Sequence, residues 1–175
     1  MKRLFSLLLP FIGCYSISCV YFNTFYNAET SYKKALIIIE ESPILEDDKF
    51  PEQAKKLLGE AIENSKIVLR KYSESKYVDD AVFIIAKASF LRGETAIAES
   101  YFNQLIRDYP ESKFYELSEI WLAYTHLRMD MISLAQEEIK KIQSRNQTGN
   151  EKSYLIHNIM AEIAEGFNLH LLGLD

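Results

Sequence analysis

Apolar residues recur with helical spacing along most of the chain. The clearest stripe has four apolar residues at positions i, i+4, i+7 and i+8, which share one face of a helix. Its members are Ala98, Phe102, Leu105 and Ile106. We expect Thr95 to cap this helix and Tyr109 to end it, because the residue before Pro110 is pushed out of helical geometry. The pattern predicts an all-α chain of short amphipathic helices.

The pattern repeats at an offset of 37 residues. Residues 71–77, KYSESKY, align without a gap with residues 108–114, DYPESKF. The same offset pairs apolar residues on both sides of this segment. The pairs are Leu69 with Ile106, Ile85 with Leu122, Ala86 with Ala123, Ala98 with Ala135, Phe102 with Ile139, and Leu105 with Ile142. Repeats of roughly 34–40 residues in helical sequence are typical of helix-turn-helix solenoids.

Four units follow from this offset, and each full unit is predicted to hold two helices. The units cover about 23–73, 79–110 and 116–147, with a partial unit at 150–175. The third unit is the weaker repeat, since Asp130 stands where the second unit has Gly93, and Gln147 where it has Pro110. We expect Trp121 on the inner side of this unit's first helix. The acidic segment at residues 42–48 is predicted to be a solvated linker.

The first residues have the layout of a secretory signal. Lys2 and Arg3 precede an apolar run over residues 4–12, and small residues follow. The two cysteines of the chain, Cys14 and Cys19, each follow a small residue, as the lipidated cysteine of a bacterial lipoprotein does. Two other interpretations stay open: an uncleaved membrane anchor, since residues 4–28 carry no charge, and plain secretion.

The residues after the second cysteine carry a resemblance to a known group of proteins. The segment at residues 19–28, CVYFNTFYNA, resembles the mature start of bacterial outer-membrane lipoproteins with tetratricopeptide repeats. This resemblance favours Cys19, with Cys14 as the alternative, as the lipidated residue that carries diacylglycerol and acyl chains. It implies that residues 1–18 are a signal peptide and that 19–175 are the mature solenoid. Because Val20 rather than Asp follows the cysteine, it also implies retention at the periplasmic face of the outer membrane.

The repeat itself resembles the tetratricopeptide pattern of large, small, Gly, Ala, aromatic and Pro positions. The matching residues are Ile85, Ala86, Gly93, Ala98, Phe102 and Pro110. Over residues 70–145 the chain is similar in repeat type to the BamD-type lipoproteins of the outer-membrane β-barrel assembly machinery and to the periplasmic partner of the Tol-Pal system. These resemblances imply a scaffold for protein partners in the cell envelope. The alternatives are an adaptor for Tol-Pal or cell-wall machinery, and the N-terminal part of a longer repeat protein or enzyme.

Composition and motifs give no indication of chemistry. The chain has a net charge of −5 and would have −7 without residues 1–18, which argues against nucleic-acid binding. It carries no phosphate-binding loop or nucleophile motif, and we expect no small-molecule substrate and no cofactor beyond the lipid. His126 has no second histidine or cysteine at i+3 or i+4, so we interpret it as a surface or groove histidine and predict no metal site. The sequence therefore predicts a protein that is not an enzyme.

What remains is a surface for partners. The first helices of solenoid units line the concave side. Helical spacing places one set of residues there as a predicted partner-binding groove: Phe83, Lys87, Phe90, Leu91, Ile120, Tyr124, Leu127 and Arg128. A competing interpretation is that several of these side chains belong to the core between repeats, Phe83 and Ile120 more than Phe90 and Tyr124.

Overall fold

The computed structural model describes residues 23–42, 50–145, 154, 156–158 and 161. Within these residues every regular element is a helix and none is a strand, so the all-α prediction is confirmed for them. The predicted signal peptide, Cys14, Cys19 and most of the acidic linker lie outside the described residues, as does most of the predicted partial unit.

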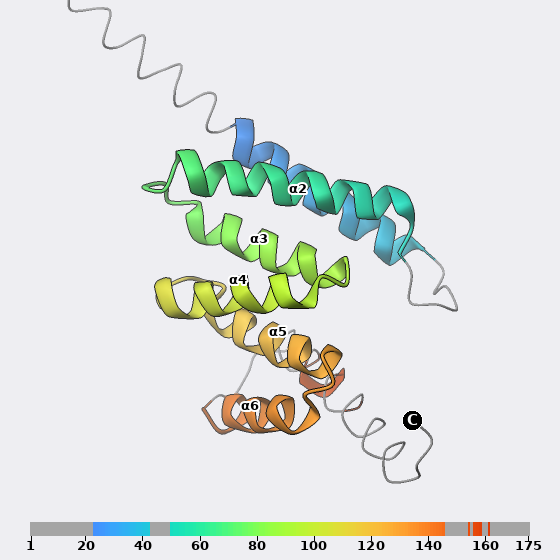
Figure 1. Cartoon of the computed structure of the whole chain (residues 1–175), viewed down its shortest axis with the longest axis vertical. Helices are drawn as coiled ribbons and strands as arrows, with labels where there is room; N and C mark the ends of the chain where they lie inside the picture. The colour runs from blue at the N-terminus through green and yellow to red at the C-terminus, as the bar shows by residue number, and fades with distance from the viewer. Residues whose placement is uncertain (1–22, 43–49, 146–153, 155, 159–160, 162–175) are drawn as a thin grey trace, which may run out of the picture. The chain divides into compact units, whose positions relative to one another are not determined.

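Helices follow one another along the chain with short connections (Figure 1). A helix covers residues 23–41, and residues 154, 156–158 and 161 are helical. The helices between them are α2 (Glu52–Lys71), α3 (Val78–Leu91), α4 (Thr95–Asp108), α5 (Tyr115–Arg128) and α6 (Ile132–Arg145). The helix predicted between Thr95 and Tyr109 agrees with α4 to within one residue. Thr95 differs from its expected role, because it is the first helical residue and no side chain caps α4.

The chain divides into two compact units, residues 1–88 and 89–175. In the first unit, the helix over residues 23–41 lies alongside α2 (Figure 1). Their shared core joins apolar side chains of this helix, α2 and α3. It consists of Phe25, Ala61, Val68, Ala81 and Ile84, with Tyr32, Leu69 and Tyr77 packed against it. The ring of Phe25 stacks on that of Tyr77 with a centroid distance of 4.6 Å.

In the second unit, α4 packs against α5 and α5 packs against α6. The core between α5 and α6 is aliphatic, and Ile156 from the last helical residues adds to it. It consists of Ile120, Ala123, Ala135, Ile139, Ile142 and Ile156. Consecutive helices therefore pack against their neighbours, as in a helical repeat protein. Most of the second-helix stripes that the sequence predicts are buried, since Ala98, Phe102, Ala135 and Ile139 are all 0% exposed, whereas Ile106 is half-buried.

The turn between repeats recurs with the 37-residue offset. The Tyr72 amide donates to the Val68 carbonyl at 2.9 Å, and 37 residues later the Tyr109 amide donates to the Leu105 carbonyl at 2.9 Å. The hydroxyl oxygens of two equivalent serines, Ser75 and Ser112, each accept from the amide two residues on, both at 3.1 Å. The ammonium groups of Lys76 and Lys113 lie over the rings of Tyr77 and Phe114 at 4.9 and 4.7 Å. The repeat is therefore present in backbone and side-chain contacts.

The turn inside each hairpin also recurs, although its sequence differs. Gly93 has a φ of 78° and Asp130, at the equivalent position, has a φ of 66°. Each donates its amide to the carbonyl three residues back, at 2.9 and 3.0 Å. The next amide reaches five residues back, to the Ser89 and His126 carbonyls, at 2.9 Å in both cases. These bonds define a left-handed helix C-cap. The sequence suggested that the third unit departs from the repeat here, because Asp130 replaces glycine. The structure shows that Asp130 keeps the same turn.

Candidate functional site

The structure places the predicted groove residues at different depths. Phe83 and Lys87 lie in the first unit and are 7% and 8% exposed, so they present little surface to a partner. Burial lowers the pKa of the Lys87 ammonium well below its usual range, since desolvation disfavours the charged form. Ile120 is fully buried in the core of the second unit, as the competing interpretation expected.

The other predicted groove residues belong to the second unit and keep accessible surface. Four of them are half-buried and Arg128 is exposed. The half-buried ones are Phe90, Leu91, Tyr124 and Leu127. Tyr124 and Leu127 also pack against the core between α5 and α6, so each has one side on the core and another at the surface. These five residues are the part of the predicted groove that remains accessible at the surface.

Three rings form what we call the aromatic cluster: Phe90 at the end of α3, and Trp121 and Tyr124 on α5. The ring of Phe90 lies 5.1 Å from Trp121, at 63°, and 5.0 Å from Tyr124, at 44°. Trp121 and Tyr124 stack at 5.6 Å and 30°. All three rings are half-buried. Such ring pairs stabilise their arrangement beyond simple area burial, so the cluster is a fixed, partly exposed aromatic surface.

Trp121 was missing from the predicted groove. It was expected on the inner side of its helix. In the structure the neighbouring Leu122 is buried, whereas Trp121 is half-buried and its ring contacts Phe90 and Tyr124. The i, i+3 spacing of Trp121 and Tyr124 was the signal in the sequence, because residues three apart share a helix face.

His126 lies in a second cluster that the sequence did not predict. It is in the last turn of α5 and is 5% exposed. Its Nδ1 is 2.7 Å from Oε2 of Glu138 on α6, and its Nε2 is 3.3 Å from Oε1 of Glu99 on α4. The hydrogen bond to Glu138 is the main cause that raises the pKa of His126 above its usual value, against the opposing effect of desolvation. The expectation of a surface or groove histidine is wrong, because the ring is buried between three helices.

The geometry around His126 does not suit a metal ion. A ligating imidazole uses one ring nitrogen and leaves the other for a supporting hydrogen bond. Here the two carboxylates contact opposite ring nitrogens, so Glu99 and Glu138 do not converge on a common point beside one of them. Among the described residues, no group of three or more His, Cys, Asp and Glu side chains is arranged to hold a metal.

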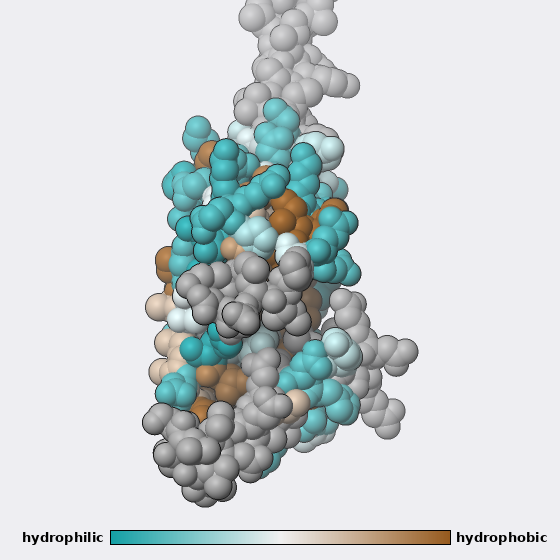
Figure 2. All heavy atoms as spheres, turned by 90° about the vertical axis from the view of Figure 1, so that its right-hand side faces the viewer, coloured by the Kyte–Doolittle hydropathy of each residue, from teal (hydrophilic) through white to brown (hydrophobic). Residues whose placement is uncertain are grey.

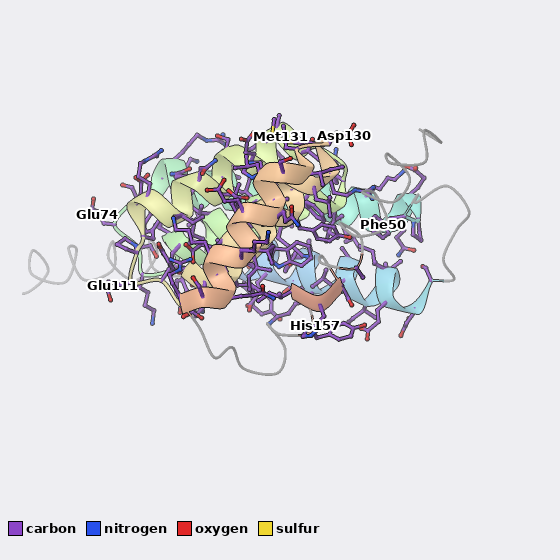
Figure 3. All side chains as sticks on the ribbon, turned by 90° about the horizontal axis from the view of Figure 1, so that it is seen from below. Phe50, Glu74, Glu111, Asp130, Met131 and His157 are labelled. Atoms are coloured by element: carbon purple, nitrogen blue, oxygen red, sulfur yellow. The ribbon has the colours of Figure 1, made fainter. Side chains whose placement is uncertain are left out.

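Outside these two clusters, the structure also shows surface residues that the groove prediction did not include. On the face that Figure 2 shows, hydrophilic side chains cover most of this surface and apolar ones appear between them in small groups. Two exposed aliphatic residues occupy equivalent repeat positions, Ile97 on α4 at 42% and Leu134 on α6 at 41%. Met131 lies beside Asp130 at the turn before α6 and is 42% exposed (Figure 3). No helix in the described ranges is both long and apolar enough to cross a membrane.

Comparison with known proteins adds no further constraint on the site. No protein-family model matches the chain, and no curated protein matches it either.

Proposed function

We propose that this chain is a non-enzymatic scaffold of the tetratricopeptide type, anchored by lipid at the periplasmic face of a bacterial outer membrane. The observation that carries the scaffold part is the recurrence of both turns at a 37-residue offset, with equivalent hydrogen bonds in both turns and a left-handed residue in the turn inside each hairpin. Each further helical hairpin that stacks on the last one lengthens the surface of a repeat protein, and such extended surfaces bind other proteins.

The tetratricopeptide type is supported by the burial of small residues at the small positions of the repeat pattern. Ala86, Ala98 and Ala135 occupy these positions and are 0% exposed. Phe102, at the aromatic position of the repeat pattern, is also fully buried. The third unit places Ile139 there, equally buried, so an aliphatic side chain fills the same position.

The partner surface that we propose is the aromatic cluster together with Leu91, Leu127 and Arg128. Aromatic residues and arginine contribute most to the binding energy of protein interfaces, because they combine large contact area with few rotatable bonds or several donors. The three rings are held by one another, which reduces the entropy lost when a partner binds. Among envelope machineries, we propose outer-membrane protein assembly first.

A photo-crosslinking experiment tests the partner surface. A photoreactive amino acid is placed at Leu91 or at Arg128, with the exposed Lys140 on α6 as the matched control position. We expect defined adducts from the first two positions and none from the control. Adding Trp121→Ala should reduce the adduct at position 128 at least several-fold, while circular dichroism shows that the variant still folds.

Mass spectrometry of the adducts then separates the candidate roles. Barrel-assembly components support the leading proposal, whereas Tol-Pal or cell-wall proteins support the adaptor role. Equal adducts from Lys140, or adducts unaffected by loss of Trp121, would contradict the assignment of the aromatic cluster as the binding surface.

A further inference from the structure

The side chain of His126 connects three consecutive helices. It projects from the last turn of α5, while Glu99 lies on α4 and Glu138 on α6, 27 residues before and 12 residues after it. The Nδ1–Oε2 distance to Glu138 is 2.7 Å and the Nε2–Oε1 distance to Glu99 is 3.3 Å. The imidazole is 6% exposed and the two carboxylates are 26% and 33% exposed, so water competes little for the ring.

The number of protons on the ring decides whether both contacts can exist together. A neutral imidazole has one N–H donor and one lone pair, whereas an ionised carboxylate only accepts. One of the two contacts would then bring a nitrogen lone pair against a carboxylate oxygen, which is repulsive. The imidazolium ion has two N–H donors and bonds to both carboxylates, with added strength from the opposite charges.

We propose that His126 is a proton-dependent clamp, which as imidazolium ties α4 and α6 to α5 and which gives up one of these two contacts when it loses its proton. This clamp is separate from the proposed partner binding, because it affects the stability of the packing between α4, α5 and α6. It also bears on the aromatic cluster, since Trp121 and Tyr124 lie on α5, the helix at the centre of the clamp.

The charges around the ring favour the protonated form. Glu99 and Glu138 are the charged groups that face it from α4 and α6, and both are acidic. Two arginines of these helices are engaged elsewhere: Arg107 pairs with Asp108, and Arg145 with Glu119. The C-terminal end of α5, where His126 lies, also favours a cation because of the helix dipole.

The direction of the pH effect follows from the raised pKa of His126. In the unfolded chain the imidazole has its ordinary pKa of about 6.5. The folded state binds this proton more tightly than the unfolded chain does. The protonated His126 therefore contributes its full stabilisation at pH values below the pKa of the unfolded chain. This stabilisation is lost as the pH rises through the higher pKa of the folded state. The second unit should therefore loosen on going from mildly acidic to alkaline solution.

Titration by NMR of the full chain in detergent micelles tests the clamp. With ¹⁵N-labelled histidine, the resonances that vanish in His126→Gln belong to His126. We expect both of its ring nitrogens to be protonated at pH 6, and a titration midpoint above the ordinary value. Glu138→Gln should lower the midpoint more than Glu99→Gln does, because the Glu138 contact is shorter.

Thermal unfolding of the same proteins gives the second readout. The melting temperature of the wild type should fall between about pH 6 and pH 9 by several degrees more than that of His126→Gln, whose side chain does not titrate. If His126→Gln proves too unstable, Glu138→Gln keeps the imidazole and should flatten the same dependence. A midpoint at or below the ordinary histidine value, or equal pH dependence in wild type and variants, would overturn the proposal.

Discussion

At the scale of single residues, the two left-handed positions show how one turn tolerates two residue types. Gly93 adopts a φ of 78° with no side chain to oppose it, and a Cβ built there meets nothing within 4 Å. Asp130 adopts a φ of 66°, which short polar side chains accept more readily than others do. The constraint at both positions is therefore the backbone conformation and not the available space.

Opposite substitutions at these two positions should have opposite effects on stability. Gly93→Ala should lower the free energy of unfolding by about 1–2 kcal/mol, because alanine pays the full left-handed penalty. Asp130→Gly should raise the free energy of unfolding by roughly 0.5 kcal/mol, because the left-handed penalty of aspartate disappears. The greater freedom of glycine in the unfolded chain offsets only part of this gain. Urea denaturation of each variant beside the wild type measures both values. A loss of stability in Asp130→Gly would show that the aspartate side chain makes a favourable contact.

At the scale of elements, the second unit is stabilised by pairs of consecutive helices. The aliphatic core between α5 and α6 is closed by Ile156, which is 2% exposed although it comes from the last described helical residues. Arg145 at the end of α6 adds a two-pronged hydrogen bond to Glu119 on α5, with both distances at 2.8 Å. The apolar contact of Ile156 shows that chain beyond α6 belongs to the folded unit.

Truncation of Ile156 should therefore destabilise the second unit. We expect Ile156→Ala to lower the free energy of unfolding by about 2–4 kcal/mol, because a buried isoleucine loses its transfer energy and leaves a cavity. The matched control is Tyr154→Ala two residues earlier, where the side chain is 70% exposed and the expected change is within about 0.5 kcal/mol. Equal effects of the two substitutions, measured by urea denaturation, would mean that Ile156 is not part of this core.

At the scale of the whole molecule, we propose a protein that combines a helical repeat scaffold with a lipid anchor. The repeats give a protein surface, and the acyl chains that we predict on Cys19 would fix that surface to a membrane. One acyl chain binds a bilayer weakly, whereas two or three hold a protein stably. The location of the scaffold would thus depend on one residue near the N-terminus.

The two cysteines offer a matched pair for testing this anchor. Cys19→Ala should abolish incorporation of labelled palmitate and move the protein from the membrane fraction to the periplasmic fraction. Cys14→Ala should leave both properties unchanged, since this cysteine is expected to be removed with the signal peptide. Fractionation and labelling in a bacterial host measure both. Membrane retention and labelling of Cys19→Ala would contradict the assignment, and loss of both in Cys14→Ala alone would transfer it to Cys14.

For the residues that the structure describes, the sequence by itself determined that they form helices and that equivalent positions recur every 37 residues. Helical periodicity and turn residues act over a few positions, so the burial of Phe102 and Ile139 could be predicted from spacing alone. Tertiary structure decided which side chains meet across helices. His126 finds its carboxylates on two other helices, and Trp121 joins Phe90 at the surface. A periodic stripe shows which face of a helix is apolar, but only the packed helices set the register at which neighbouring side chains come into contact.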